Sequence, residues 1–211
     1  MLVTAIKGCG RNEAEIVIED EEPFRLYSSE LSEYGIYEGA ELTQQTVGVL
    51  YELIQKRATI RAMHLLKARD YTTFRLREKL KSGGYPDVCT DYAIEYVTRC
   101  GYLNDDRYAR NHISYHFYDR TRYRLISDLT DKGINRELAE FVYAEVENEN
   151  GGGSELEQAV KHLVKKGYKA GMSDSDRVTT SKMMASLARK GFPAGVIREA
   201  IGHLDIEGAQ E

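Results

Sequence analysis

Residues 101–109 read GYLNDDRYA, and this stretch combines the end of one helix with the start of another. Glycine suits the left-handed backbone position that ends many helices, so Gly101 predicts a helix end. The tyrosine and leucine that follow are expected to fold back onto the completed turn. Asn104 or Asp105 can cap the next helix, and acidic residues suit the positive end of its dipole. The stretch predicts a tight joint between two helical modules, although other helical proteins contain such joints too.

The same pattern occurs three times around this joint. A short helix ends near a leucine, a glycine follows four residues later, and an apolar helix comes next. The leucine positions are Leu80, Leu129 and Leu187, and the glycine positions are Gly84, Gly133 and Gly191. In the apolar helix, Cys89, Ala93 and Val97 correspond to Leu138, Val142 and Val146, and then to Val196, Ala200 and Leu204. A repeat length of about 50 residues predicts an array of similar modules.

The residues before the repeats differ in character. Three short alternating segments within residues 2–27 are separated by turn residues, which predicts an antiparallel meander. From Thr43 onward, apolar residues recur at helical spacing, in one long helix or in two with a bend near Lys56. Residues 171–176 are expected to form a loop.

We therefore predict a mainly α fold, a tandem array of three-helix repeats with a small N-terminal antiparallel β meander. The predicted segments are residues 1–57 for the meander and a lead-in helix, 58–103, 104–148 and 154–205 for the three repeats, 149–153 for a linker, and 206–211 for a tail.

Charge is distributed unevenly along the chain. The net charge is −8 over residues 1–52, +7 over residues 53–136 and −4 over residues 137–211, which gives −5 for the 211 residues. A basic segment is the usual sign of contact with nucleic acid or with an acidic protein surface. The alternative is a solvated surface whose charge the acidic ends balance in the fold.

Arginines and tyrosines alternate within the basic segment, just after the central joint. Arginine can pair with phosphate and tyrosine can stack on bases, so this composition suits a nucleic acid. It also suits an acidic protein surface, and some of the tyrosines, Tyr108 first among them, are expected to be buried. The candidate contact residues are Arg107, Arg110, Arg120, Arg122 and Arg124.

We find no pattern that points to catalysis, to a cofactor or to a metal. His112 and His116 lie four residues apart on a predicted helix, but no third ligand stands at a suitable spacing. The three cysteines also lack metal-ligand spacing. Cys89 and Cys100 fall on the apolar stripe of the predicted helix after Gly84, and Cys89 fits a buried apolar position. With neither a long apolar run nor a signal-peptide pattern, the chain is expected in the cytoplasm, away from membranes.

The repeats and the joint together resemble the RecX family, bacterial regulators of the RecA recombinase. The resemblance covers nearly the whole chain. Its most specific parts are Gly101-Tyr102-Leu103-Asn104-Asp105, Leu76-Arg77-Glu78-Lys79-Leu80 and Leu129-Thr130-Asp131-Lys132-Gly133-Ile134.

The resemblance implies a regulator, not an enzyme, that works without a cofactor. It would bind the RecA nucleoprotein filament, inhibit the recombinase and ATPase activities of RecA, and so modulate recombination, DNA repair and the SOS response. We also expect the protein to be a monomer. Single- or double-stranded DNA is left open as a second partner. Two other function classes stay open: a DNA-binding transcriptional regulator whose helix-turn-helix is formed by residues 72–82 and 86–100, and a structural adaptor.

Overall fold

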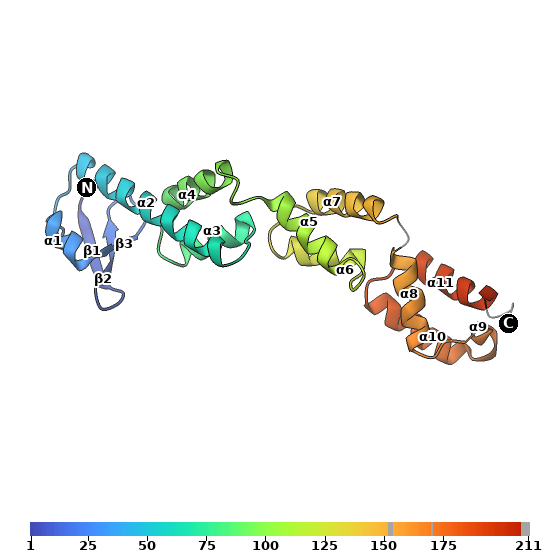
Figure 1. The fold of residues 1–211 in the computed structure, drawn as a ribbon. Helices are drawn as coiled ribbons and strands as arrows, with labels where there is room; N and C mark the ends of the chain where they lie inside the picture. The colour runs from blue at the N-terminus through green and yellow to red at the C-terminus, as the bar shows by residue number, and fades with distance from the viewer. Residues whose placement is uncertain (152–153, 170, 208–211) are drawn as a thin grey trace. The chain divides into compact units, whose positions relative to one another are not determined.

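The N-terminal part of the chain folds as a three-stranded antiparallel sheet. The computed structural model describes residues 1–151, 154–169 and 171–207. Its strands lie in the order β1-β2-β3 (Figure 1). They are β1 (Val3–Gly8), β2 (Glu13–Ile18) and β3 (Phe24–Tyr27). Alternate side chains such as Ile16 and Leu26 are fully buried, so one face of the sheet belongs to the core. The predicted meander is confirmed.

Four helices follow the sheet and share its core. They are α1 (Ser28–Glu33), α2 (Gln44–Ala68), α3 (Thr73–Lys81) and α4 (Asp87–Arg99). The Thr43 side chain caps α2, where it accepts a hydrogen bond from the Thr46 backbone N–H at 3.1 Å. α2 is one continuous helix, so the alternative with a bend near Lys56 is wrong. The sheet and these helices form one compact unit, Met1–Asn104, with a single hydrophobic core.

The rest of the chain forms a second compact unit, Asp105–Glu211. Its first three helices are α5 (Asp105–His116), α6 (Arg122–Thr130) and α7 (Arg136–Glu149). Its later helices are α8 (Ser154–Lys165), α9 (Met172–Ser175), α10 (Arg177–Arg189) and α11 (Ala194–Glu207). The two groups have separate cores, one around Ile113 and Val142 and one around Leu163 and Leu187.

Equivalent positions of the three repeats have the same environment. Leu80, Leu129 and Leu187 are each 0% exposed. Gly84, Gly133 and Gly191 each adopt a positive φ, at 82°, 83° and 92°. Each glycine reverses the chain after a short helix, and the leucine before it points into the core of its own repeat. This agreement confirms the repeated architecture, while the boundaries that we assign to each repeat stay a proposal.

The central joint has the predicted backbone conformation. Gly101 has a φ of 75°, and the Leu103 N–H donates back to the Val97 carbonyl at 3.2 Å. Leu103 is buried in the core of the first unit, as expected. Tyr102 is 54% exposed, so its side chain lies mostly at the surface.

Two further details differ from the sequence-based expectation. The expected loop at residues 171–176 contains the one-turn helix α9. Cys100, the C-cap residue of α4, is exposed, whereas Cys89 is buried as predicted. Parts of the predicted linker and tail, residues 152–153 and 208–211, lie outside the described residues.

Candidate functional site

The helices of the second repeat place the five candidate arginines in different surroundings. Arg107 and Arg110 lie on α5, Arg122 and Arg124 on α6, and Arg120 in the turn between these helices. Neighbours on the two helices, not sequence spacing alone, determine how much of each guanidinium faces outward.

Arg110 connects two helices of its repeat. Its guanidinium donates to the Glu149 carboxylate on α7 at 2.8 Å and also to Glu145 on the same helix. The hydrogen bond with Glu149 raises the pKa of Arg110 above its ordinary value, so it stays charged. Arg110 thus stabilises the packing of α5 on α7, and its charge is locally balanced.

Arg120 and Arg124 share one carboxylate. Arg120 pairs with Asp128, and the Nε atom of Arg124 lies 3.0 Å from the other Asp128 oxygen. The Asp128 side chain is only 10% exposed, so its ion pairs with the two arginines are partly buried and stabilise the start of α6. Each guanidinium has five N–H donors and Asp128 cannot accept from all of them. Two positive charges on one negative charge leave a local excess of +1.

Arg122 and Arg107 have other surroundings. The backbone N–H of Arg122 donates to the Glu155 carboxylate of α8 at 2.9 Å. The Arg122 guanidinium lies 5.1 Å from the ring centroid of the buried Tyr143, a cation–π distance. Arg107 is exposed on the first turn of α5. The structure therefore brings Arg120 and Arg124 together and places the other three elsewhere on the same repeat.

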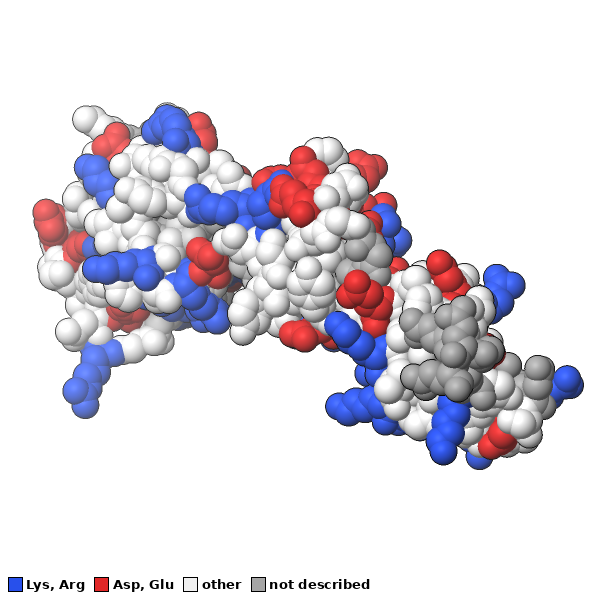
Figure 2. Space-filling view, turned by 45° about the vertical axis from the view of Figure 1, so that its right-hand side comes forward, with Lys and Arg blue, Asp and Glu red and all other residues white. Residues whose placement is uncertain are grey.

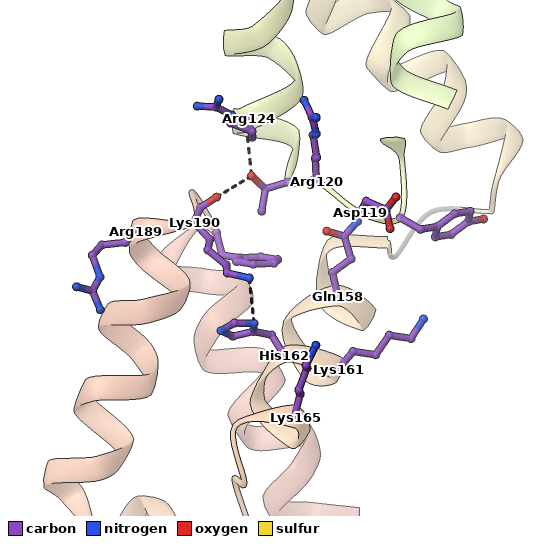
Figure 3. Close-up of a pocket in the computed structure, with 12 residues that line it drawn as sticks. Asp119, Arg120, Arg124, Gln158, Lys161, His162, Lys165, Arg189 and Lys190 are labelled. Carbon is purple, nitrogen blue, oxygen red and sulfur yellow. Dashed lines mark hydrogen bonds between the residues drawn. The ribbon is translucent and has the colours of Figure 1, made fainter. Parts of the chain in front are cut away.

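Arg120 and Arg124 line a pocket of about 440 Å³ between the second and third repeats. The third repeat supplies the opposite wall, from α8 and from the end of α10 (Figure 3). Six of the twelve lining residues are lysine or arginine, and one, Asp119, is acidic. The basic lining residues are Arg120, Arg124, Lys161, Lys165, Arg189 and Lys190.

Sequence reasoning missed the third-repeat side of this pocket. The net charge of residues 137–211 is −4, which hides a local gathering of basic side chains. The spacing of Lys161 and Lys165 was the available signal, since residues four apart on a helix lie on one face. Figure 2 shows basic side chains gathered on one side of the right-hand body, which contains the helices of the third repeat, with few acidic ones among them.

Three contacts hold the pocket walls together. The Thr121 hydroxyl donates to the Lys190 carbonyl at 2.9 Å, and the Gln158 amide donates to the Phe117 carbonyl at 2.6 Å. The bond from the Arg122 N–H to Glu155 is the third, and burial raises the pKa of Glu155. The turn before α6 is thereby attached to α8 and α10.

Tyrosines of the same region are mostly available for contact. Tyr115, Tyr118 and Tyr123 are exposed, while Tyr108 is partly buried against the core of the second repeat, as the sequence predicted. Exposed rings beside arginines can stack on bases or pack against a protein surface.

His112 and His116 do lie side by side, with ring centroids 5.0 Å apart. The residue beside this pair is Lys132, whose Nζ atom lies 3.4 Å from the His112 Nδ1 atom. Within the residues that the structure describes, no three histidine, cysteine, aspartate or glutamate side chains gather closely enough to hold a metal. None of the described helices is long and apolar enough to cross a membrane.

The first repeat presents an unfavourable face for reading DNA through α4. The side chains that α4 exposes include Asp91, Tyr92 and Glu95, and the helix packs its other face on α2. Carboxylates in the middle of a recognition helix would repel the phosphates that flank a DNA groove. This surface disfavours a helix-turn-helix transcriptional regulator.

Comparison with known proteins places the chain in a family. A regulatory protein RecX from Trichlorobacter lovleyi is 34% identical over 142 residues, which cover 65% of this chain and 89% of the relative. The chain belongs to the RecX family of regulatory proteins. A regulatory protein RecX from Bacillus velezensis is 25% identical over 206 residues, covering 93% of this chain and 74% of the relative. The family model described as the third three-helix domain of RecX matches residues 154–201.

Solved RecX structures share this fold. The crystal structure of a regulatory protein RecX superposes with a TM-score of 0.62 at 18% identity, covering 95% of this chain and 98% of that one. RecX from Lactobacillus salivarius gives a TM-score of 0.60 at 21% identity over 72% of this chain and 97% of that one. The mainly helical fold with a small N-terminal sheet is therefore a RecX fold.

Proposed function

We propose that this protein is a non-enzymatic regulator that binds the RecA nucleoprotein filament. By binding it would inhibit the recombinase and ATPase activities of RecA and so modulate recombination, DNA repair and the SOS response in the cytoplasm. Membership of the RecX family is the observation that carries this proposal. The protein would act as a monomer and would need no cofactor.

The basic surface of the second repeat is the proposed contact. A RecA filament carries a nucleic acid. A protein whose basic side chains contact the phosphates gains affinity because the counterions of the nucleic acid are released. Arg107 and Arg122 are exposed, whereas Arg110, Arg120 and Arg124 form ion pairs within the repeat. We therefore propose that Arg107 and Arg122 make the main contact with the filament. The N–H groups of Arg120 and Arg124 that do not bind Asp128 would contribute further contacts.

Co-sedimentation tests the partner directly. RecA is assembled on single-stranded DNA with a slowly hydrolysed ATP analogue, and the protein is added at a fixed low salt concentration. We expect it to pellet with the filament and to stay in solution with RecA that lacks nucleotide and DNA. Random-sequence duplex alone is the third sample. Equal or tighter binding to this duplex would instead favour a DNA-binding regulator, and binding to none of the three would favour an adaptor.

A further inference from the structure

The centre of the pocket between the second and third repeats holds side chains that the proposed filament contact does not use. His162 and Lys165 come from α8, and Lys190 ends α10 (Figure 3). The Lys190 ammonium and the His162 ring point toward one another, with Nζ and Nδ1 3.2 Å apart. The other His162 nitrogen lies 3.5 Å from the Ser186 hydroxyl. Phe192, which is 7% exposed, contributes an apolar part of the lining.

These cations lack balancing anions. No carboxylate of the described residues lies within 4.0 Å of the Lys165, Arg189 or Lys190 side chains. Asp119, the acidic residue of the lining, forms no ion pair with them among the described residues. Like charges that face one volume repel each other unless an anion enters. The backbone contacts of Thr121 with Lys190, and of Gln158 with Phe117, nevertheless hold the two walls in place.

We propose that this pocket binds a compact oligophosphate, such as a nucleoside triphosphate or inorganic triphosphate, through Lys165, Lys190 and His162. Its volume of about 440 Å³ falls within the usual range for small-ligand sites, about 300–1,000 Å³. Lysine ammonium groups bind phosphate as point charges, and the arginines at the rim supply further donors.

The arrangement of the basic side chains favours a compact anion over an extended nucleic-acid strand. A strand that runs across a surface is matched by cations along a groove, whereas here cations from α8, α10 and the turn before α6 face a single volume. The same phosphate chemistry could come from the backbone of a nucleic acid, and the experiment below separates these sources. The proposal does not depend on RecA as a partner.

His162 gives the site a pH dependence. Burial, followed by Lys190, Lys166 and Lys165, lowers the pKa of His162, so the ring is neutral near pH 7 in the empty pocket. The groups on the opposite wall are Asp119, Arg120 and Arg124. A bound phosphate favours the charged ring, so binding takes up a proton and becomes tighter as the pH falls.

Calorimetric titration with sodium triphosphate and with ATP, both without metal, tests the site. The pocket variant is Lys165→Gln with Lys190→Gln. The matched control is Lys169→Gln with Lys182→Gln, two exposed lysines outside the pocket lining whose loss changes the net charge equally. A short single-stranded oligonucleotide is the third ligand. Circular dichroism melts of all proteins show whether each variant is folded.

We expect the parent to bind triphosphate, the folded pocket variant to lose about tenfold or more in affinity, and the control to bind as the parent does. Triphosphate that fails to bind the parent, or that binds both variants equally, would overturn the proposal. Binding of the oligonucleotide alone would also overturn it and would assign the pocket to an extended strand. Failure of the RecA co-sedimentation would leave these outcomes unchanged, so the two proposals can fail separately.

Discussion

Gly101 is the residue on which the central joint depends. Its φ of 75° lies in the left-handed region, and a Cβ atom added there would meet no atom within 4 Å. Replacing it with a residue that has a Cβ atom therefore strains the backbone without a clash at that atom. We expect Gly101→Val to lower the free energy of unfolding by about 1 kcal/mol or more, because a β-branched residue resists positive φ. Urea denaturation followed by circular dichroism measures the loss.

Gly48 provides the matched control for this substitution. It also has open space around its Cβ position, but it lies inside α2 and has no positive φ. Gly48→Ala is expected to stabilise the protein by about 0.5–1 kcal/mol, since alanine has the higher helix propensity. If Gly101→Val left stability unchanged while Gly48→Ala raised it, the left-handed conformation at the joint would be refuted.

His112 predicts a pH dependence of stability. Burial and the nearby Lys132 and His116 lower its pKa to about 4, and its Nε2 atom is buried without a hydrogen-bond partner among the described residues. In the unfolded chain the pKa returns to its ordinary 6.5, so between these values the unfolded state binds the extra proton. Stability should fall by about 1–2 kcal/mol from this group as the pH drops from 6.5 toward 4.

Melts of the parent and of His112→Gln across this pH range measure that contribution. The variant should lose less stability on acidification than the parent. His64→Gln, which changes an exposed histidine, should follow the parent. Identical acid slopes for His112→Gln and the parent would show that His112 is not held neutral by the fold.

Among the elements, the turn between α10 and α11 connects the third repeat to the second. Gly191 has a φ of +92°, and a Cβ atom there would approach the Tyr123 ring to 2.8 Å and the Thr121 hydroxyl to 3.1 Å. Gly191→Ala must therefore displace the Tyr123 side chain or the Thr121 hydroxyl. We expect a loss of about 1–3 kcal/mol in unfolding free energy, from overpacking as well as from positive φ.

Gly167 isolates the packing part of this effect. It has a similar φ of +84° but nothing within 4 Å of its Cβ position. Gly167→Ala should thus cost only the backbone strain, and the difference between the two variants in thermal melts reports the contact between α6 and α10. Equal losses would mean that the two repeats do not touch at Gly191.

The sequence predicts the elements of this protein better than it predicts the site. Leucine and glycine at matching offsets specify a helix, a left-handed turn and a core position locally, so Leu80, Leu129 and Leu187 could be identified without a structure. The basic pocket could not, because it combines the turn before α6 with α8 and α10. Regional net charge also hides the local excess at Lys165 and Lys190, since acidic residues of the same segment lie elsewhere.

For the molecule as a whole, we propose that it inhibits RecA through the basic surface of the second repeat. Each phosphate contact contributes about 0.9 to the slope of log affinity against log salt. The double variant Arg107→Gln with Arg122→Gln removes two outward charges and leaves the Asp128 ion pairs in place. Folding should lose no more than about 1 kcal/mol, from exposed charges and the contact over Tyr143.

Inhibition of the DNA-dependent ATPase of RecA across a salt series is the most direct measurement. The parent should inhibit strongly at low salt and lose affinity steeply as salt rises. The double variant should inhibit more weakly with a flatter slope, while Arg11→Gln with Arg198→Gln, an equal loss of charge outside the second repeat, should match the parent. A folded Arg107→Gln and Arg122→Gln variant that inhibits as the parent does at every salt concentration would contradict this contact, and a parent that never inhibits would contradict the function itself.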